Sequence, residues 1–311
     1  MSLEMFVQNF FNALGLGALY GLIAVGYTMV YGILRLINFA HGDIFMLGAY
    51  FVFFATIQYK LPWALGVALA IGGATLCGLL VDRIAYRPLR GAPRISALIS
   101  AIGVSFFLQN LGVVVFTGMP RAVIRPRELT NPLPIKDIIP LEFLQAGRIG
   151  EVRLIPLAIW VPVVSFLLVA VLLWIVYKTK PGLAMRAISR DIETTRLMGV
   201  SVDRVIALTF ALGSALAAFA GIMWALRYPR VEPFMGVIPG FKAFIAAVFG
   251  GIGSIPGAMI GGLILGFVEI MSVAFFPHLS GYRDAFAFIL LIFILLVKPT
   301  GLLGERMEEK I

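Results

Sequence analysis

The sequence predicts an all-α polytopic membrane protein, a bundle of 8–10 transmembrane helices formed by residues 1–311 as one domain. The chain is 60% hydrophobic and only 13% charged, whereas soluble domains are about one quarter charged. Its apolar residues fall in runs of about twenty, the length that crosses a hydrocarbon core. The alternating segments typical of a transmembrane β-barrel do not appear. These observations together predict helices that span a bilayer.

Nine apolar runs are expected to form the bundle. We predict them at residues 6–33, 37–58, 61–81, 96–117, 154–177, 205–226, 239–251, 256–276 and 284–298. The run 239–251 is too short to cross alone. It joins 256–276 through the sequence GGIGSIPGA. We expect this turn to lie within the membrane, where protein or a watery cavity must cover its backbone.

The basic residues flank the apolar runs and set the orientation. Segment 82–94 has four arginines against one acid, and 178–204 has six basic residues against three acids. Both are therefore predicted to be cytoplasmic, because cytoplasmic loops carry an excess of Lys and Arg. The proline-rich segment 118–153 is then extracytoplasmic, and parity places the N-terminus outside and the C-terminus inside. The net charge of +9 thus reflects membrane orientation, and no nucleic-acid partner is predicted.

Several kinds of chemistry are excluded by the residues that are missing. The single cysteine, Cys77, can form neither a disulfide within the chain nor a thiolate metal site. No G-x-x-x-x-G-K-[ST] motif is present, so the chain does not bind ATP as a P-loop protein does. We expect no cofactor and no metal in this chain. Two histidines, with no serine in a nucleophile motif, also make an intramembrane enzyme a poor interpretation.

Small residues at four-residue spacing predict where helices pack closely. In lipid, helices associate where small side chains let backbones approach. Such spacing occurs in the first run and around the turn at 250–258. The predicted packing glycines are Gly17, Gly21, Gly253, Gly257 and Gly261. The alternative is that these glycines line a pore or a moving interface.

The stretch LRLINFAHGDIFMLGAY, residues 34–50, places polar side chains between two apolar runs. Asp43 is expected to cap the helix that follows, and Arg35 to reach the inner headgroups. The alternative is a break at Gly42, with Asn38, His41 and Asp43 lining a polar path, because ionisable groups at membrane depth are often functional.

Three further polar residues lie inside predicted spans. Gln109 and Asn110 are expected to make hydrogen bonds between helices. Glu269 must be protonated, paired or hydrated, and an arginine or Lys242 could pair with it. The alternative for all three is a place on the substrate path. The candidate path residues are therefore Asn38, His41, Asp43, Gln109, Asn110 and Glu269.

The cytoplasmic segment 178–204 contains an amphipathic stretch. We predict one short helix over 183–198, ended by Gly199 as the residue after the C-cap. Such a helix either rests on the lipid interface or binds a cytoplasmic partner. Ala187–Val202 resembles the coupling loop of ATP-binding-cassette (ABC) importer permeases, which enters a groove on the ATPase. The resemblance assigns ATPase coupling to Arg186, Ala187, Arg190, Asp191, Glu193, Arg196 and Gly199.

Longer motifs carry a more specific resemblance. The sequences GALYGLIAVGYTMVYGILRLINFAHGDIFMLGAY, DRIAYRPLR, LISAIGVSFFLQN, SVDRVIALTFALGSALAAFAG and GFKAFIAAVFGGIGSIPGAMIGGLILGFVE resemble LivH-type permeases of high-affinity branched-chain amino acid importers. The resemblance covers most of the chain apart from 118–153.

This resemblance implies a bacterial inner-membrane, multi-pass subunit that pairs with a second, LivM-type permease. Two cytoplasmic ATPase subunits would bind ATP and magnesium, and a periplasmic binding protein would deliver leucine, isoleucine or valine. Urea or short amides are an alternative solute, since related permeases carry them. An ion-gradient-driven secondary transporter is the alternative of another class, although no internal repeat of the kind common in such folds is evident.

Overall fold

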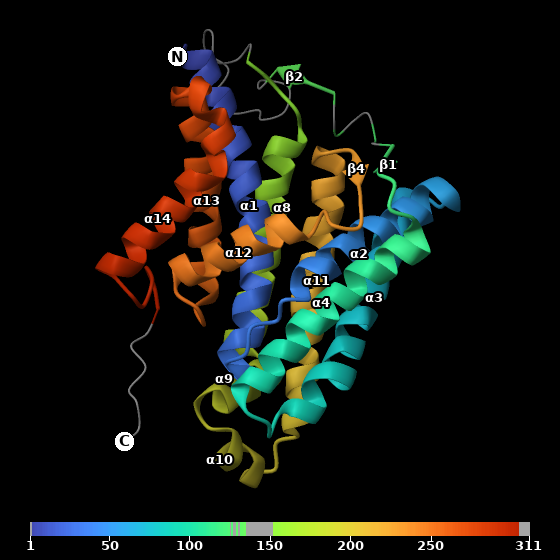
Figure 1. The fold of residues 1–311 in the computed structure, drawn as a ribbon, viewed down its shortest axis with the longest axis vertical. Helices are drawn as coiled ribbons and strands as arrows, with labels where there is room; N and C mark the ends of the chain where they lie inside the picture. Colours follow the sequence, from blue (N-terminus) through green and yellow to red (C-terminus); the bar gives the residue numbers. More distant parts are fainter. Residues whose placement is uncertain (1, 125, 127–128, 130, 135–151, 305–311) are drawn as a thin grey trace.

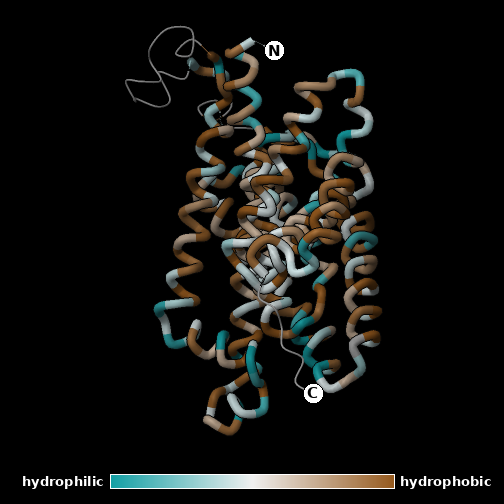
Figure 2. Tube along the Cα trace, turned by 90° about the vertical axis from the view of Figure 1, so that its left-hand side faces the viewer, coloured by the Kyte–Doolittle hydropathy of each residue, from teal (hydrophilic) through white to brown (hydrophobic). Residues whose placement is uncertain are grey.

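A computed structural model describes residues 2–124, 126, 129, 131–134 and 152–304. The remaining residues include most of the predicted extracytoplasmic segment. The described chain forms an upright bundle of helices (Figure 1), which confirms the all-α membrane fold. Hydrophobic residues fill most of its height, and many of its hydrophilic segments lie at the two ends (Figure 2).

Nine apolar helices correspond to the nine predicted runs. Within the described residues they are α1 (Leu3–Leu34), α2 (His41–Phe53), α3 (Trp63–Val81), α4 (Arg94–Phe116), α8 (Leu157–Lys178), α11 (Val202–Arg227), α12 (Val237–Gly250), α13 (Ile255–Phe275) and α14 (Arg283–Val297). Seven helical segments are long and apolar enough to cross a bilayer. Helices α2 and α12 are the two shorter elements, so the bundle combines full-length spans with partial ones.

Short irregular helices and four small strands complete the described structure. Helices α2 and α3 each continue into a π-helical turn, η1 (Phe54–Gln58) and η2 (Asp82–Tyr86), and η2 continues into the 3₁₀ turn η3 (Arg87–Leu89). A second 3₁₀ turn, η5 (Pro277–Tyr282), precedes α14. Strands β1 (Arg121–Ala122) and β4 (Arg230–Val231) pair, as do β2 (Leu133–Pro134) and β3 (Arg153–Leu154).

The two ends of the bundle differ as the charge pattern predicts. The paired strands lie at the same end as the start of α1, whereas α9 (Lys180–Arg190) and α10 (Ile192–Leu197) lie at the opposite end (Figure 1). The predicted extracytoplasmic and cytoplasmic segments are therefore on opposite sides.

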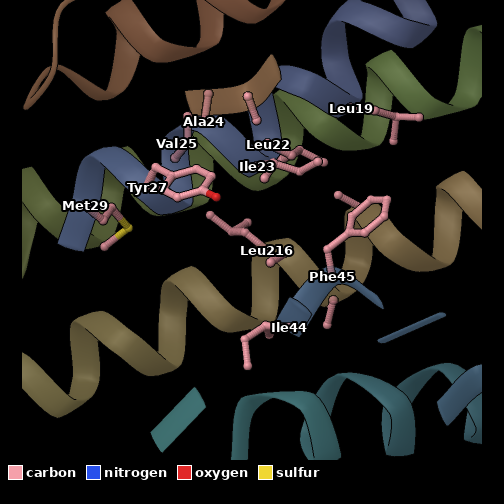
Figure 3. Packing of buried hydrophobic residues seen from close by; sticks show 14 of the residues in the cluster. Leu19, Leu22, Ile23, Ala24, Val25, Tyr27, Met29, Ile44, Phe45 and Leu216 are labelled. Atoms are coloured by element: carbon pink, nitrogen blue, oxygen red, sulfur yellow. The ribbon is translucent and has the colours of Figure 1, made fainter. Parts of the chain in front are cut away.

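Helix α1 is the centre of the bundle. Its most apolar window is 94% buried, and it packs against α2, α8, α11, α12 and α13. Figure 3 shows part of one buried hydrophobic cluster, to which α1 contributes Leu22 and Tyr27, α2 contributes Phe45 and α11 contributes Leu216. At 32 residues and about 1.5 Å per residue, α1 is longer than the hydrocarbon core is thick.

Glycine contacts hold α1 against α13. A Cβ added to Gly17 would lie 2.7 Å from Cα of Leu263, and one added to Gly21 would lie 3.2 Å from the carbonyl oxygen of Met259. The facing residues are Gly262 and Gly266, whose added Cβ atoms would overlap the backbone of α1. Gly17 and Gly21 therefore lie where the predicted close approach requires them.

The turn between α12 and α13 divides the remaining predicted glycines into two groups. Added Cβ atoms at Gly257 and Gly261 would overlap backbone atoms of α12, so both lie at a helix contact. Gly253 differs from the prediction: it has a φ of +101°, and no atom outside its immediate chain neighbours lies within 4 Å of its added Cβ. It is a turn residue, because only glycine adopts this conformation without strain, and Ser254 then caps α13.

The contact between α1 and α13 generates a direct prediction. Gly262→Ala should lower the free energy of unfolding by about 1–3 kcal/mol, because overpacking a close contact forces helices apart. Gly103→Ala is the matched control, since no atom lies within 4 Å of its added Cβ. Thermal unfolding in detergent, followed by circular dichroism, measures both. Equal melting temperatures for the two variants would contradict the close contact.

Candidate functional site

The chain is interrupted inside the bundle between α1 and α2. Helix α1 ends at Arg35, which adopts a left-handed conformation with a φ of 53°. Helix α2 then begins at His41, with Ala40 as its N-cap. In Figure 1 this connection lies beside the lower half of the bundle, and α2 starts at about half its height. Asn38 and Ala40 of the connection are buried, as is every residue of α2 except Phe51. Protein therefore covers the non-helical backbone next to the start of α2, as the membrane requires.

Asp43 points to α4 from the first turn of α2. Its Oδ1 accepts a hydrogen bond of 3.1 Å from Nε2 of Gln109, which also donates to Oγ of Ser105 at 3.0 Å. The helix has no side-chain cap, so the predicted capping role of Asp43 is wrong. The other carboxylate oxygen, Oδ2, is buried without a hydrogen-bond partner in the described structure. Asp43 is therefore held in place by one oxygen while the other is available.

A small cavity adjoins this carboxylate. Its volume is about 50 Å³, and it lies between the start of α2, α4 and the start of α12. Its lining combines polar side chains with aromatic rings. The residues that give it this character are Asp43, Gln109, Tyr27, Phe39, Phe241 and Phe244. A charged oxygen beside aromatic surface suits a ligand with a cationic group and an apolar body.

Glycines bring the starts of α2 and α12 into contact. A Cβ added to Gly42 would lie 2.6 Å from the carbonyl oxygen of Gly236, and an added Cβ on Gly236 would overlap Gly42. Gly240 lies one turn further along α12, also against Gly42. The two short helices therefore meet through backbone beside the cavity. A small shift of either helix would change the shape of the cavity.

Asn38 and His41 are buried, but they do not line this cavity. Asn38 accepts a hydrogen bond of 3.0 Å from the hydroxyl of Tyr86. His41 packs against Tyr27, with ring centroids 4.7 Å apart, and its Nε2 lies where a side chain on Gly26 would be. Through these contacts the two residues fix the interrupted segment against η2 and α1.

Asn110 lies apart from the other candidate path residues. It is exposed on the outer face of α4, and its amide donates to the carbonyl oxygen of Phe106 in the same helix at 2.7 Å. The predicted hydrogen bond between helices is therefore absent for Asn110, whereas Gln109 makes one to α2.

Glu269 belongs to a separate buried charge cluster. It is 0% exposed, forms an ion pair with Arg283, and accepts a hydrogen bond of 3.0 Å from Tyr20. Lys242 lies 3.0 Å from Glu269 and 2.6 Å from Asp284. The partners expected from sequence, Lys242 and an arginine, are both present. Two cations and two carboxylates thus join α12, α13 and α14, and Tyr20 adds α1.

The charges of this cluster compensate one another, which explains why it is tolerated inside the bundle. A lone buried carboxylate is costly, whereas a paired and hydrogen-bonded one is compensated. Nearby Arg283 is 38% exposed at its side chain and Asp284 is 55% exposed, so the cluster reaches the surface at the start of α14. The geometry gives Glu269 a clear role in fastening α14 and α12 to the core.

The segment 178–204, predicted to be cytoplasmic, contains two short helices, α9 and α10, where the sequence predicted one. Helices α9 and α10 meet at Asp191, which has an extended backbone, with φ of −154°, and caps α10 through hydrogen bonds from the amides of Glu193 and Thr194. The single helix over 183–198 is therefore wrong. Aspartate strongly favours N-cap positions, and here that preference ends one helix and starts the next. Gly199, with a φ of +82°, ends α10 as predicted.

The charged residues within 180–196 are exposed, and an exposed apolar tip follows them. Met185 and Ile188 face the bundle, whereas Leu197 and Met198 are 86% and 79% exposed. Arg186 lies over the ring of Tyr177 at 5.3 Å. The other residues assigned to coupling are exposed, except Ala187, which is half-buried; they are Arg190, Asp191, Glu193, Arg196 and Gly199.

Sequence reasoning missed several members of these clusters. Ser105 lies four residues before Gln109, a spacing that puts both on one helical face, and this signal was available. Tyr20, Tyr86 and Asp284 carry no such signal, because their partners come from distant parts of the chain.

Comparison with known proteins decides the family. Residues 9–295 match the family model described as branched-chain amino acid transport system, permease component. The chain belongs to this family. It is 42% identical to the permease protein LivH of the high-affinity branched-chain amino acid transport system of Salmonella typhimurium, over 98% of both chains. It is 39% identical to the corresponding protein BraD of Pseudomonas aeruginosa, again over 98% of both.

A more distant relative is a permease for a different kind of solute. The ribose import permease protein RbsC of Escherichia coli is 26% identical over 85% of this chain and 77% of its own length. The protein described here is thus a multi-pass membrane permease of a transport system.

The charge cluster generates the prediction for this site. Glu269→Gln should lower the free energy of unfolding by about 3 kcal/mol, because Arg283 loses its ion pair and Lys242 keeps only Asp284 as its partner. Arg230→Gln is the control, since its ion pair with Glu232 is exposed and worth no more than about 1 kcal/mol. Thermal unfolding of both variants in detergent measures the difference. An unchanged melting temperature for Glu269→Gln, together with lost transport, would instead place Glu269 on the substrate path.

Proposed function

We propose that this chain is one of two unlike membrane subunits of an ATP-driven importer for leucine, isoleucine and valine. Its relatives over nearly the whole length are named as permeases of high-affinity branched-chain amino acid transport systems. A second, LivM-type permease would complete the pore in the bacterial inner membrane. A periplasmic binding protein would deliver the amino acid to the end of the bundle that carries the paired strands.

The observation that carries the ATP-driven mechanism is the exposed tip formed by Leu197 and Met198. Both side chains are exposed. They belong to the end of α10, a helix that lies at one end of the bundle, beyond the apolar spans (Figure 1). An exposed apolar patch rimmed by charged residues marks a protein-binding surface. Two ATPase subunits would bind there and supply the ATP and magnesium sites, so this chain itself needs no cofactor.

Packing of α9 offers a route from the ATPase to the transport path. Helix α9 contacts α1, α8 and α11, with Met185 and Ile188 buried between them. Helix α1 in turn carries Tyr27 at the cavity and Gly26 against His41. Movement of α9 would therefore shift the helices that surround Asp43.

The cavity at Asp43 suits one end of an amino acid. The free Oδ2 of Asp43 would bind the α-ammonium group, and the rings of Phe241 and Phe244 would contact the branched side chain. At about 50 Å³ the cavity is too small for a whole leucine. In this account the path widens when the two permease subunits move. A weak site in the permease is sufficient, because the binding protein supplies the affinity for the amino acid.

Asp43→Asn tests the ammonium contact. Uptake of labelled leucine at limiting concentration should fall about tenfold or more, because a hydrogen bond to a charged group contributes about 1.5–3 kcal/mol. The measurement uses proteoliposomes that hold the complete transporter with internal ATP. Ser105→Ala is the control, since it keeps the carboxylate. Uptake by Asp43→Asn equal to that of the parent would refute a role for this charge.

Leu197→Asp combined with Met198→Asp tests the docking tip. The ATPase subunits should no longer co-purify with the permease, because two carboxylates would have to be buried in an apolar groove. Met119→Asp is the control: Met119 is 75% exposed but follows α4 at the end that carries the strands. Co-purification that survives the double substitution would overturn the docking assignment.

An ion gradient provides the test against the rival mechanism. Proteoliposomes that contain this chain alone should accumulate no leucine when a proton or sodium gradient is applied without ATP. Accumulation under these conditions would identify a secondary transporter.

A further inference from the structure

A second cavity lies apart from the one at Asp43 and shares no lining residue with it. It has a volume of about 570 Å³ and lies between the end of α3, the turns that follow it and the start of α11. Leucines of α3 and Ala207 of α11 form its apolar wall, and arginines line its other end. The cavity is therefore divided into an apolar part and a cationic part.

The arginines outnumber the acids at this cavity. Arg90 binds both Asp82, at 2.6 Å, and Asp203, and Arg87 binds Asp203 at 2.6 Å. The two carboxylates are thus already paired. Arg83 and Arg204 also line the cavity, and neither makes an ion pair within the residues that the structure describes. Four guanidinium groups against two carboxylates leave an excess positive charge at the cytoplasmic end.

The apolar wall lies at membrane depth. Leu76 precedes Asp82 by six residues, which is about 9 Å along a helix. Leu76 and Leu80 are 58% and 46% exposed and belong to a segment apolar enough to span a bilayer. A soluble partner that binds the arginines could not reach Leu76. An occupant of the whole cavity therefore needs an anionic end at the cytoplasmic surface and an apolar end within the bilayer.

We propose that this cavity binds an anionic phospholipid of the cytoplasmic leaflet. The phosphate would contact Arg83 and Arg204, and an acyl chain would lie along Leu76, Leu80 and Ala207. Basic pockets between transmembrane helices on the cytoplasmic side bind anionic headgroups in this way, and arginine matches phosphate geometry through its planar fork of donors.

Such a lipid would connect two elements that matter for coupling. Helix α3 packs against α11, and the lipid would fill the gap where their cytoplasmic ends separate. The start of α11 follows directly from Gly199 and the docking tip. Bound phospholipid would therefore stabilise the position of α11 next to the coupling segment.

Native mass spectrometry of the purified full chain tests this proposal. The probes are phosphatidylglycerol and phosphatidylcholine with identical acyl chains, added to the detergent-solubilised protein. The parent should retain one phosphatidylglycerol in preference to phosphatidylcholine. Arg83→Gln combined with Arg204→Gln should weaken that adduct about thirtyfold, since each arginine near an anionic lipid contributes about fivefold.

Two further variants distinguish binding in this cavity from non-specific attraction of an anionic lipid to positive surface charge. Lys178→Gln combined with Lys180→Gln removes two exposed charges on the same side and should keep the adduct. Ala207→Trp fills the apolar part, keeps all arginines and should lose the adduct. Circular dichroism checks that each variant keeps its helices.

Three results would overturn the proposal. They are equal retention of the two lipids by the parent, an adduct that survives both Ala207→Trp and the arginine substitutions, and equal loss in the lysine control. Stabilisation by inorganic phosphate as strong as by phosphatidylglycerol would show that the cavity binds a small anion. Binding of phosphatidylglycerol that the second permease subunit displaces would assign the surface to that partner.

Discussion

The covering of polar groups by protein at membrane depth is the constraint on which this structure depends. A chain that breaks its helix between Arg35 and His41 must cover the freed backbone with other protein. Glycine contacts make this possible: α13 lies close against α1, and the start of α12 closes directly on the start of α2. The bundle can therefore hold a helix end, a carboxylate and a small cavity at its centre. A uniform bundle of full-length spans would offer no such place.

The same constraint explains how charge is distributed. Glu269 is fully buried, and its partners come from three other helices. Asp43 differs, because one of its oxygens has a partner and the other has none within the described residues. A balanced cluster stabilises a fold, whereas an incompletely satisfied carboxylate beside a cavity is suited to a ligand that brings the missing donor. In this account Glu269 serves the structure and Asp43 serves transport.

Much of this architecture could be predicted from the sequence, because span length and glycine spacing are local signals. The nine apolar runs, Gly17 and Gly21, and the partners of Glu269 are examples. The orientation of Asn110 could not be predicted, since lipid-facing and protein-facing sides of a membrane helix are equally apolar. The split at Asp191 depends on competition between two local preferences, helix continuation and N-capping. Tyr86 could be recognised as the partner of Asn38 only in the folded structure, whereas the four-residue spacing of Ser105 from Gln109 was a signal in the sequence.

The central claim is that the region around Asp43 is the transport path and that the cytoplasmic ATPases move it. Replacing Cys77 with Ser provides a cysteine-free background, because the chain has one cysteine. Ser105→Cys then places a thiol beside the cavity. The rate at which a membrane-impermeant thiol reagent labels this position in the reconstituted transporter is the most direct measurement. The account predicts that ATP changes this rate and that leucine-loaded binding protein changes it further. A rate that is the same with and without nucleotide and binding protein would contradict it.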